Sequence, residues 1–576
     1  MTRQRLSAVV MTHPRRRAAA EKLALSAPAG LVRVVMDPDP TGTPSVLRTA
    51  LAAWSSIEDG ATHQLVIQDD MTLSETFFDR VRSAIEELPD AALALFALWD
   101  SRNGAAVRWG AMAGARWVGA VNEYFPCVAI VLPRPVAEGF VAYGRSRLGG
   151  WPDDILMHRY LRDTGVPRYV AVPNLAEHQD HGSLSGNAFR GPRRSVCFLP
   201  DDVPEEEGRT LAAPAVLPFF KHGVAQCAVR VPGPGPERRL HLDTEQYLRG
   251  AGLPGSLLRP PGAGAAGADL RGTWLTALAM GFEASRTGLA VPCGPSGAYA
   301  ESVATIGTGG ISNTSTDEHL AQRRDPLARM AHRALDAGRE AAAHRPRPRP
   351  RRQDGLVWRA AANPLGEHLS RRLADLRERS DAVVDLTRVR STEPVVVIRP
   401  HDDPVPYTLS VGEVYGPGCS RHTPIGRMVW DALRSRPVTV AGPPDAEVHP
   451  LHVNDLADAV AAILRTRPAA HDLTAATGAP CTAAELAQAV HTAVRPVPVR
   501  AVAEETPGWR APADGAERPP GWAPSTDLPR GLHTFAQWLA YEGVLLEPGP
   551  PPPDEPAPRP VPDRGARRPP HGGDGR

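Results

Sequence analysis

The sequence predicts an α/β protein with one α/β domain at the N-terminus, a second, partial α/β domain near the C-terminus, and a Pro-rich tail. Short apolar runs alternate with helical patterns from residue 6 onward, which is the order of a parallel sheet with helices on its faces. Apolar runs of the same kind resume after about residue 380. The length of 576 residues accommodates both, since one domain usually takes roughly 100–200 residues.

The N-terminal elements follow a β-α-β-α-β order. Strands are expected over 6–11, 31–36 and 65–67, and helices over 18–25, 45–57 and 74–88. No G-x-G-x-x-G follows the first strand, which disfavours a dinucleotide-binding turn there. Each strand ends in polar residues, and these ends would share one edge of the sheet, where open α/β sheets bind ligands.

The first two strand ends suggest contacts to a nucleotide. Thr12 and Arg15, after the first strand, can face phosphates. Asp37 and Asp39, after the second, can accept hydrogen bonds from the hydroxyls of a nucleoside. Charged loops at strand ends are also common without any ligand, and spacing alone leaves that alternative open.

The third strand end carries two adjacent carboxylates, Asp69 and Asp70. Two carboxylates at one site repel each other and lose hydration, and a divalent cation is the common compensation. Such a cation can hold a diphosphate in turn. The structural alternative is that Asp70 or Thr72 caps the following helix.

Two later stretches add candidate groups. Asp153 and Asp154 open a helical pattern, so they are either first-turn acids or a base near an acceptor hydroxyl. His178 follows a strand expected over 168–173 and could complete a metal site, although a lone His is more often a satisfied polar residue.

The opening β-α-β-α order, Gln68-Asp69-Asp70, Trp151-Pro152-Asp153-Asp154 and Val172 to His178 together resemble a GT-A glycosyltransferase, of the family 25-like or family 2-like kind. The resemblance implies a Rossmann-like domain over 1–200 that transfers a sugar from a nucleotide-sugar donor to an acceptor, assisted by Mn²⁺ or Mg²⁺. It places Asp69, Asp70 and His178 as metal ligands and Asp154, with Asp153, as the catalytic acid or base. Gln68 departs from the usual Asp-x-Asp motif.

The middle of the chain is expected to be an accessory region over 201–343, which could complete the acceptor side, followed by an Arg/Pro-rich linker over 344–380. Helices are expected over 274–285 and 317–343. The Gly-rich run 306–310 suggests a phosphate loop, but its Ser- and Asn-containing flanks favour a plain turn.

The C-terminal part, over 381–545, resembles the C-terminal half of NAD-dependent epimerase/dehydratases, the extended short-chain dehydrogenase fold. Val-Tyr-Gly-Pro-Gly at 414–418 and the helix start at His452 to Asp455 carry the resemblance. It implies that Tyr415, Gly416 and Asp455 lie near a sugar-nucleotide pocket. No lysine follows Lys221, so the Tyr-x-x-x-Lys pair is missing and NAD is not expected. This half would bind a sugar nucleotide, a partner protein or nothing, and Asp455 could simply cap its helix.

Composition excludes several other classes. A net charge of +1 argues against nucleic-acid binding, and the six cysteines form no C-x-x-C pair, as expected for a cytoplasmic protein without a zinc site or disulfides. No apolar run is long enough to span a membrane. The tail over 546–576 is expected to be disordered. The leading hypothesis is a glycosyltransferase; the rivals are a sugar-nucleotide epimerase or dehydratase and a non-catalytic scaffold.

Overall fold

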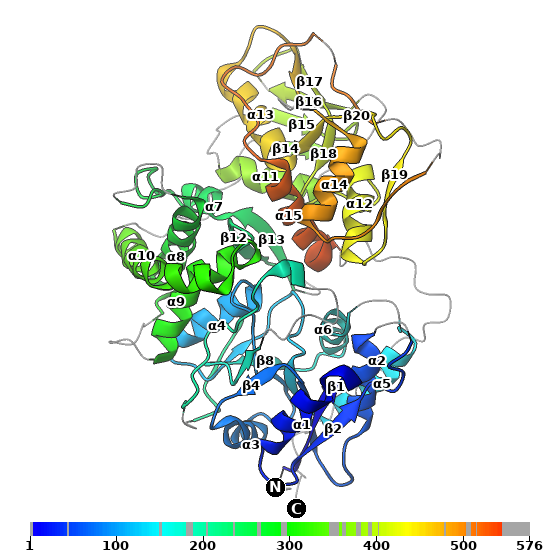
Figure 1. Ribbon diagram of the computed structural model, residues 1–576. Coiled ribbons are helices and arrows are strands. Elements are labelled where there is room, and N and C mark those ends of the chain that lie inside the picture. Colours follow the sequence, from blue (N-terminus) through cyan, green and yellow to red (C-terminus); the bar gives the residue numbers. More distant parts are fainter. Residues whose placement is uncertain are drawn as a thin grey trace, which may run out of the picture.

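The computed structural model describes residues 4–42, 45–148, 152–179, 188–202, 206–233, 237–261, 267–289, 297–344, 356–359, 364–375, 382–389, 394–400, 402–476, 480–502, 509–513 and 515–543. The Arg/Pro run at 345–352 and the tail predicted over 546–576 lie outside these residues. We call residues 4–344 the N-terminal unit and residues 356–543 the C-terminal unit; the two lie at opposite ends of the molecule in Figure 1.

The N-terminal unit is built on an eight-stranded sheet of order β10-β6-β8-β5-β7-β3-β1-β2. Its strands are β1 (Leu6–Thr12), β2 (Val32–Met36), β3 (His63–Gln68), β5 (Ala92–Ala94), β6 (Trp117–Gly119), β7 (Ala129–Pro133), β8 (Arg168–Ala171) and β10 (Thr210–Leu211). β1 pairs in parallel with both β2 and β3, which confirms the predicted β-α-β-α-β order and the α/β class. β7 runs antiparallel to β3 and β5, and β6 runs antiparallel to β8.

Both faces of this sheet are buried, because side chains alternate between two apolar clusters. Val9 and Val66 belong to the cluster on one face, whereas Val10 and Ile67 belong to the cluster on the other. The helices of this part are α1 (Arg17–Leu25), α2 (Val46–Ser55), α3 (Phe77–Glu87), α4 (Arg102–Ala113), α5 (Arg134–Arg145) and α6 (Asp153–Asp163). Two shorter strands, β4 (Met71–Leu73) and β9 (Ala176–His178), form a separate antiparallel pair.

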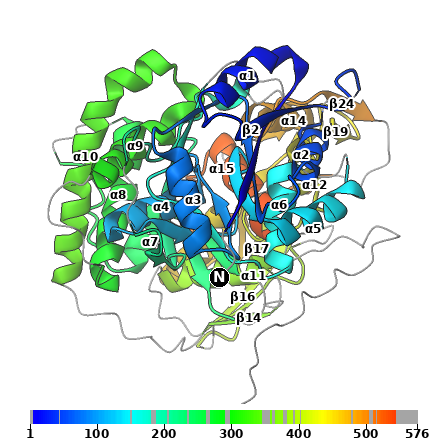
Figure 2. The ribbon, with the colours of Figure 1, turned by 90° about the horizontal axis from the view of Figure 1, so that it is seen from below.

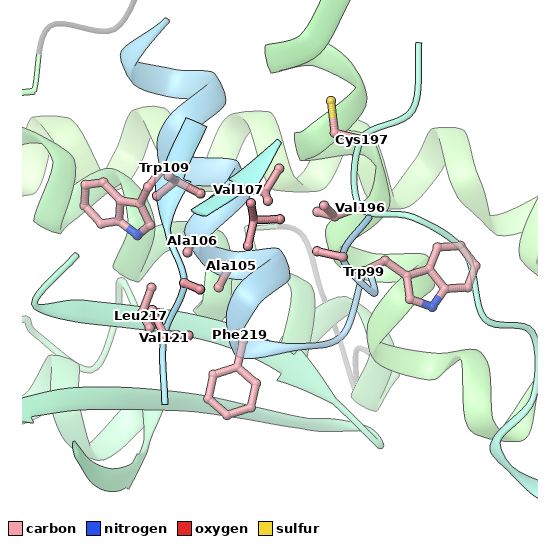
Figure 3. Packing of buried hydrophobic residues seen from close by; sticks show 14 of the residues in the cluster. Trp99, Ala105, Ala106, Val107, Trp109, Val121, Val196, Cys197, Leu217 and Phe219 are labelled. Atoms are coloured by element: carbon pink, nitrogen blue, oxygen red, sulfur yellow. The ribbon is translucent and has the colours of Figure 1, made fainter. Parts of the chain in front are cut away.

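The described residues within 201–343 form strands and helices that share the core of the first cluster. The region contains the antiparallel strands β11 (Val216–Lys221), β12 (Val224–Val231) and β13 (Arg238–Asp243), and the helices α7 (Thr244–Gly250), α8 (Ala268–Thr287), α9 (Gly297–Ile311) and α10 (Asp317–Ala343). Helices α8, α9 and α10 gather on one side of the molecule, opposite α2, α5 and α6 (Figure 2). In Figure 3, Ala105 of α4 lies on the side of the helix that faces Leu217 and Phe219 of β11. This region therefore shares the core of the N-terminal sheet, and its predicted part in completing the acceptor side stays a prediction.

The predicted turn at 306–310 is wrong, because these residues lie within α9. Their small size serves packing. A Cβ on Gly310 would lie 1.8 Å from Cδ1 of Phe220, and a Cβ on Gly307 would lie 2.6 Å from Cβ of Leu327. The glycines let α9 approach β11 and α10 closely. The helix predicted over 317–343 is confirmed as α10, which contains Pro326.

The C-terminal unit has a five-stranded sheet of order β14-β15-β16-β17-β22. Its strands are β14 (Leu356–Arg359), β15 (Ala382–Asp385), β16 (Val395–Pro400), β17 (Tyr407–Val411) and β22 (Asp472–Ala475). The unit also contains short strands that form separate pairs: β18 (Glu413–Tyr415), β19 (Val438–Ala441), β20 (Glu447–Val448), β21 (Pro450–His452), β23 (Cys481–Thr482) and β24 (Val499–Val502). Its helices are α11 (Pro364–Asp375), α12 (Pro424–Leu433), α13 (Val453–Thr466), α14 (Ala483–Ala493) and α15 (Leu528–Trp538). β14 and α11 lie inside the predicted linker 344–380, so this unit begins before the predicted boundary at 381.

The two units meet through buried polar contacts. Glu542, in the π-helix η4 (Leu539–Gly543), accepts hydrogen bonds from Arg102 Nη1 at 2.8 Å and from the Arg239 backbone N–H at 3.0 Å. The rings of His222 and His533 stack with centroids 4.7 Å apart. Both side chains of the Arg102–Glu542 pair are almost wholly buried, at 0% and 1% exposure. Because a buried charge without a partner is costly, this pair ties the units together.

Candidate functional site

Arg16 lies between the two adjacent carboxylates at the end of β3. Its Nη1 is 3.1 Å from Asp69 Oδ1 and 2.9 Å from Asp70 Oδ2. The chain turns sharply after β1 through the 3₁₀ helix η1 (Pro14–Arg16), which brings Arg16 back over the strand ends. Thr12, the last residue of β1, donates a hydrogen bond from its hydroxyl to Asp69 Oδ2. The predicted convergence of the β1 and β3 ends is therefore present.

His178 joins this group from the other side. β4 and β9 pair with Met71 opposite His178, which sets the His178 Nε2 atom 3.4 Å from Asp70 Oδ2. Arg193 Nη2 lies 3.0 Å from the same ring nitrogen. Burial alone would raise the pKa of Asp70, but its contacts with His178 and Arg16 outweigh burial and lower it. For Asp69 the burial dominates over the hydrogen bonds from Thr12 and Arg16, and its pKa is raised.

The predicted metal ligands Asp69, Asp70 and His178 thus lie together, but their arrangement does not fit a metal ion. Both oxygens of Asp69 and one of Asp70 already contact Thr12, Arg16 or His178. Of the four carboxylate oxygens, Asp70 Oδ1 alone is buried with no hydrogen-bond partner among the described residues. Across the described part of the chain, no group of three or more His, Cys, Asp or Glu side chains is placed to hold a metal. Arg16 supplies the compensating charge, and Mn²⁺ or Mg²⁺ stays a prediction.

The predicted donor-binding residues are distributed unevenly around this site. Asp37 binds Arg48 in a bidentate pair, with Nε–Oδ1 and Nη2–Oδ2 both 2.8 Å, and this pairing lowers the pKa of Asp37. The Asp37 N–H donates to the Thr12 carbonyl at 2.9 Å, so the pair adjoins the site. The Asp39 side chain is 57% exposed. Arg15 is exposed and contributes only its backbone N–H, which donates to His13 Nδ1.

Asp153 and Asp154 form the first turn of α6, and the N-cap position belongs to Pro152. Burial, with the neighbouring Asp154 charge, raises the pKa of Asp153 to about 7. Burial also raises the pKa of Asp154, against the opposing effect of Arg190 and Arg193. A carboxylate with a pKa near neutrality can accept a proton at physiological pH.

This pair lies beside the end of β3. The charges of Asp153 and Asp154 raise the pKa of Cys127, in addition to its burial, and the Cys127 carbonyl faces the Gln68 side-chain nitrogen at 3.5 Å. Arg193 connects the two acidic groups, since it contacts His178 and acts on Asp154. Among the described contacts, Arg193 is therefore the residue that links the acidic pair to the Arg16–Asp69–Asp70–His178 group.

The sequence reasoning missed the arginines of this site. Arg16 and Arg193 are described above. Arg190 and Arg495 lie over the ring of Phe189, with guanidinium carbons 5.6 and 5.8 Å from the ring centroid. Arg495 comes from the C-terminal unit and is attracted by Asp154. Arg makes up nearly all of the 65 basic residues, so no single one stood out; the only signal was the Arg15-Arg16-Arg17 run after β1.

The three residues predicted for an epimerase-like pocket make contacts that hold the C-terminal unit together. Tyr415 is 1% exposed and packs edge-on against His452, with ring centroids 5.3 Å apart. Gly416 has φ +123°, and a Cβ there would lie 2.8 Å from the His452 ring. Asp455 accepts hydrogen bonds from the Ser525 N–H at 2.8 Å and the Thr526 N–H at 3.3 Å, which holds that segment to α13.

A cavity of about 320 Å³ lies next to these residues, between the two units. We call it the junction cavity. Its walls include Pro417, His452, Asn454, Ser525 and Thr526. The three residues predicted for the pocket, Tyr415, Gly416 and Asp455, do not line it.

Comparison with known proteins leaves the family open. No protein-family model matches the chain, and no curated protein matches it. Among solved structures it is similar to the dTDP-glucose 4,6-dehydratase of Bacillus anthracis in complex with NAD (21% identity, 23% of this chain and 44% of that chain, TM-score 0.21). It is also similar to the UDP-glucose 4-epimerase of Thermus thermophilus (21%, 23% and 45%, 0.20) and the dTDP-glucose 4,6-dehydratase of Streptomyces venezuelae (20%, 24% and 45%, 0.22).

The chain spans less than half the length of each of these solved proteins. Two of them are dTDP-glucose 4,6-dehydratases and one is a UDP-glucose 4-epimerase. The molecule itself is a mixed α/β protein with a charged, largely buried site at the ends of β1 and β3. None of the helices among the described residues is long and apolar enough to cross a membrane.

Proposed function

We propose that the N-terminal unit is a glycosyltransferase that moves a sugar from a nucleotide-sugar donor to an acceptor hydroxyl. The observation that carries the proposal is the position of Arg16, a guanidinium that is 14% exposed and contacts Asp69 and Asp70 at the joint ends of β1 and β3. A second carboxylate pair, Asp153 and Asp154, has its pKa values raised by burial and is acted on by Arg190 and Arg193. Ligands of open α/β sheets bind at this edge. The combination of cations and a near-neutral carboxylate matches the two requirements of glycosyl transfer, a stabilised leaving group and a base.

In this reaction the bond between the anomeric carbon and the donor diphosphate breaks, and the diphosphate leaves with the electron pair. Arg190 and Arg193 provide positive charge for that leaving group, and Arg16 offsets the charge of Asp69 and Asp70 so that they do not repel it. The bond that forms joins the anomeric carbon to the acceptor oxygen, whose proton passes to the Asp153–Asp154 pair. By the resemblance to GT-A glycosyltransferases, a metal ion would compensate the charge of Asp69 and Asp70. We assign that role to Arg16, and the proposed reaction uses no metal ion.

The test is thermal unfolding of the full-length protein with UDP-, GDP- and dTDP-sugars, each with and without Mn²⁺. A ligand that binds only the folded state raises the midpoint. We expect one nucleotide sugar to raise it without metal. The rise should disappear in Arg16→Met and persist in the matched control Arg17→Met, since Arg17 is 63% exposed and pairs only with Glu21 in the described contacts.

The other outcomes are equally informative. A rise that requires Mn²⁺ and is lost in Asp70→Asn would support the metal site instead of Arg16. No rise with any nucleotide sugar would contradict the proposal and favour the scaffold alternative. The same scan with NAD and NADP tests the epimerase/dehydratase alternative. That alternative requires a rise in the unfolding midpoint that substitutions in the C-terminal unit abolish.

A further inference from the structure

The junction cavity has walls from both units. Strands β12 and β13 and helix α7 supply one side, and α11, α13 and α15 supply the other. In Figure 1, α7 and β13 face α11 and α15 across the boundary between the units. Its volume of about 320 Å³ lies at the lower end of the roughly 300–1,000 Å³ typical of small-molecule sites. The cavity is therefore large enough for a small ligand, and that ligand would touch both units.

Three buried histidines line the cavity. His241 accepts a hydrogen bond from Arg102 at Nδ1 (3.1 Å) and donates from Nε2 to Gln226. His368 Nε2 lies 3.2 Å from Asn454 Oδ1, and the Asn454 N–H donates to His452 Nδ1 at 3.3 Å. Burial lowers the pKa of His241 and His452 well below the usual range and that of His368 to about 4. All three rings are neutral at pH 7.

The arginines of the cavity are already neutralised. Arg372 binds Asp458 with both carboxylate oxygens, at 2.8 and 2.9 Å. Arg249 contacts Glu245 at 2.7 Å, and Arg530 contacts Asp243. A free anion would have to displace one of these carboxylates. Within the described residues, the wall therefore offers no uncompensated positive charge to a phosphate or carboxylate.

The other wall residues are the apolar Val224, Leu242 and Pro417 and a set of neutral side chains that can form hydrogen bonds. These neutral side chains are the amides and hydroxyls of Gln226, Gln246, Asn454, Ser525, Thr526 and Thr534. Several of these groups already have protein partners, since Gln226 contacts His241 and the Ser525 hydroxyl donates to Asp455. Ligand hydroxyls can use the capacity that remains, because each hydroxyl or amide can both donate and accept. Charge-balanced walls with many hydroxyls and amides suit a ligand that is uncharged and rich in hydroxyl groups.

We infer that the junction cavity binds a neutral polyhydroxylated ligand of the size of a sugar unit, and that this ligand fastens the two units together. The site is separate from the Arg16 group and holds no residue of it. The inference does not depend on the proposed glycosyl transfer, since the cavity is built from other residues.

The test uses the full-length protein with D-glucose, D-galactose, D-mannose and maltose as probes, and with glucose 6-phosphate, glucuronate and UDP-glucose as anionic counterparts. Binding is read from the shift of the unfolding midpoint and from saturation-transfer NMR of the free sugar. We expect at least one neutral sugar to bind and to raise the midpoint. Gln246→Trp, which fills the cavity from α7, should abolish both signals, whereas Gln322→Trp, on the exposed face of α10, should leave them intact.

A second variant keeps the test independent of the bulky substitution. Thr534→Val keeps the shape of the side chain but removes its hydroxyl, which lies 3.4 Å from His452 Nε2. Loss of one hydrogen bond should weaken sugar binding by about tenfold. The inference is overturned if no neutral sugar binds, or if only the anionic probes bind in a way that Gln246→Trp abolishes.

Discussion

Two arginine–carboxylate clusters of the N-terminal unit use the same chemistry in different ways. In the closed cluster, Arg80 binds both oxygens of Glu207, at 2.7 and 2.9 Å, and both side chains are 0% exposed. Arg116, Asp202 and the Trp117 indole N–H complete it. In the open cluster, Arg16 contacts Asp69 and Asp70, stays 14% exposed, and leaves Asp70 Oδ1 with no hydrogen-bond partner in the described part of the chain.

The difference shows what a buried ion pair can be used for. The closed cluster satisfies both oxygens of Glu207, so it holds β6 and α3 to Asp202 and Glu207. The open cluster lies at the ends of β1 and β3, and its Asp70 Oδ1 atom can still accept a hydrogen bond. Removing a partner from the first should therefore cost stability, whereas changes around the second should affect binding and turnover.

The largest effect is expected for Glu207→Gln. The substitution leaves the guanidiniums of Arg80 and Arg116 buried with less opposing charge, and breaking a buried pair typically costs about 3–5 kcal/mol. Urea unfolding measures this loss. The control, Glu21→Gln, breaks an exposed pair with Arg17 and should cost less than about 0.5 kcal/mol. Equal losses in the two variants would show that the closed cluster is not structural.

The next effect concerns turnover at the open cluster. If the acidic pair takes the acceptor proton, Asp154→Asn should lower the rate by about 10²–10⁴-fold, the usual contribution of a general base. The rate is measured as nucleotide released from the donor identified in the binding scan. The affinity for the donor is measured alongside the rate, because Asp154 also acts on Arg190 and Arg193, and the unfolding midpoint without donor serves as the control for folding. A rate within about twofold of the wild type would remove the pair from the mechanism.

A pH-dependent effect follows from the raised pKa of Asp153, about 7 against an ordinary value of about 3.9. The folded protein keeps this proton over a range in which the unfolded chain has lost it. Stability from this group is therefore fully present below about pH 4 and is lost as the pH rises to about 7, by up to about 4 kcal/mol. In Asp153→Asn this part of the loss should disappear, as shown by unfolding midpoints from about pH 4 to 8. Parallel profiles for the two proteins would contradict it.

The smallest effect is expected for Arg495→Ala. Arg495, from the C-terminal unit, lies over the Phe189 ring and is attracted by the charge of Asp154. Its removal should weaken donor binding by about three- to tenfold, the size of a cation–π contact, with little change in stability. Titration calorimetry with the identified nucleotide sugar measures this. Arg500→Ala, an exposed residue of the same unit, is the control.

The sequence by itself determined the α/β class, the parallel β1–β3 order and the convergence of Asp69, Asp70 and Thr12, because local apolar periodicity and the shared edge of a parallel sheet fix them. It also determined α10, whose Thr316 cap and long helical pattern are local signals.

Only the tertiary structure decided the rest. It selected Arg16 rather than Arg15, because the turn of η1 sets which guanidinium reaches the strand ends. It made a helix of the glycines at 306–310, because close packing against Phe220 favours small residues more than it penalises glycine in a helix. It also created the junction cavity, whose histidines and carboxylates lie far apart in the chain. Contacts over such separations depend on how the units pack, and no local pattern of residues encodes them.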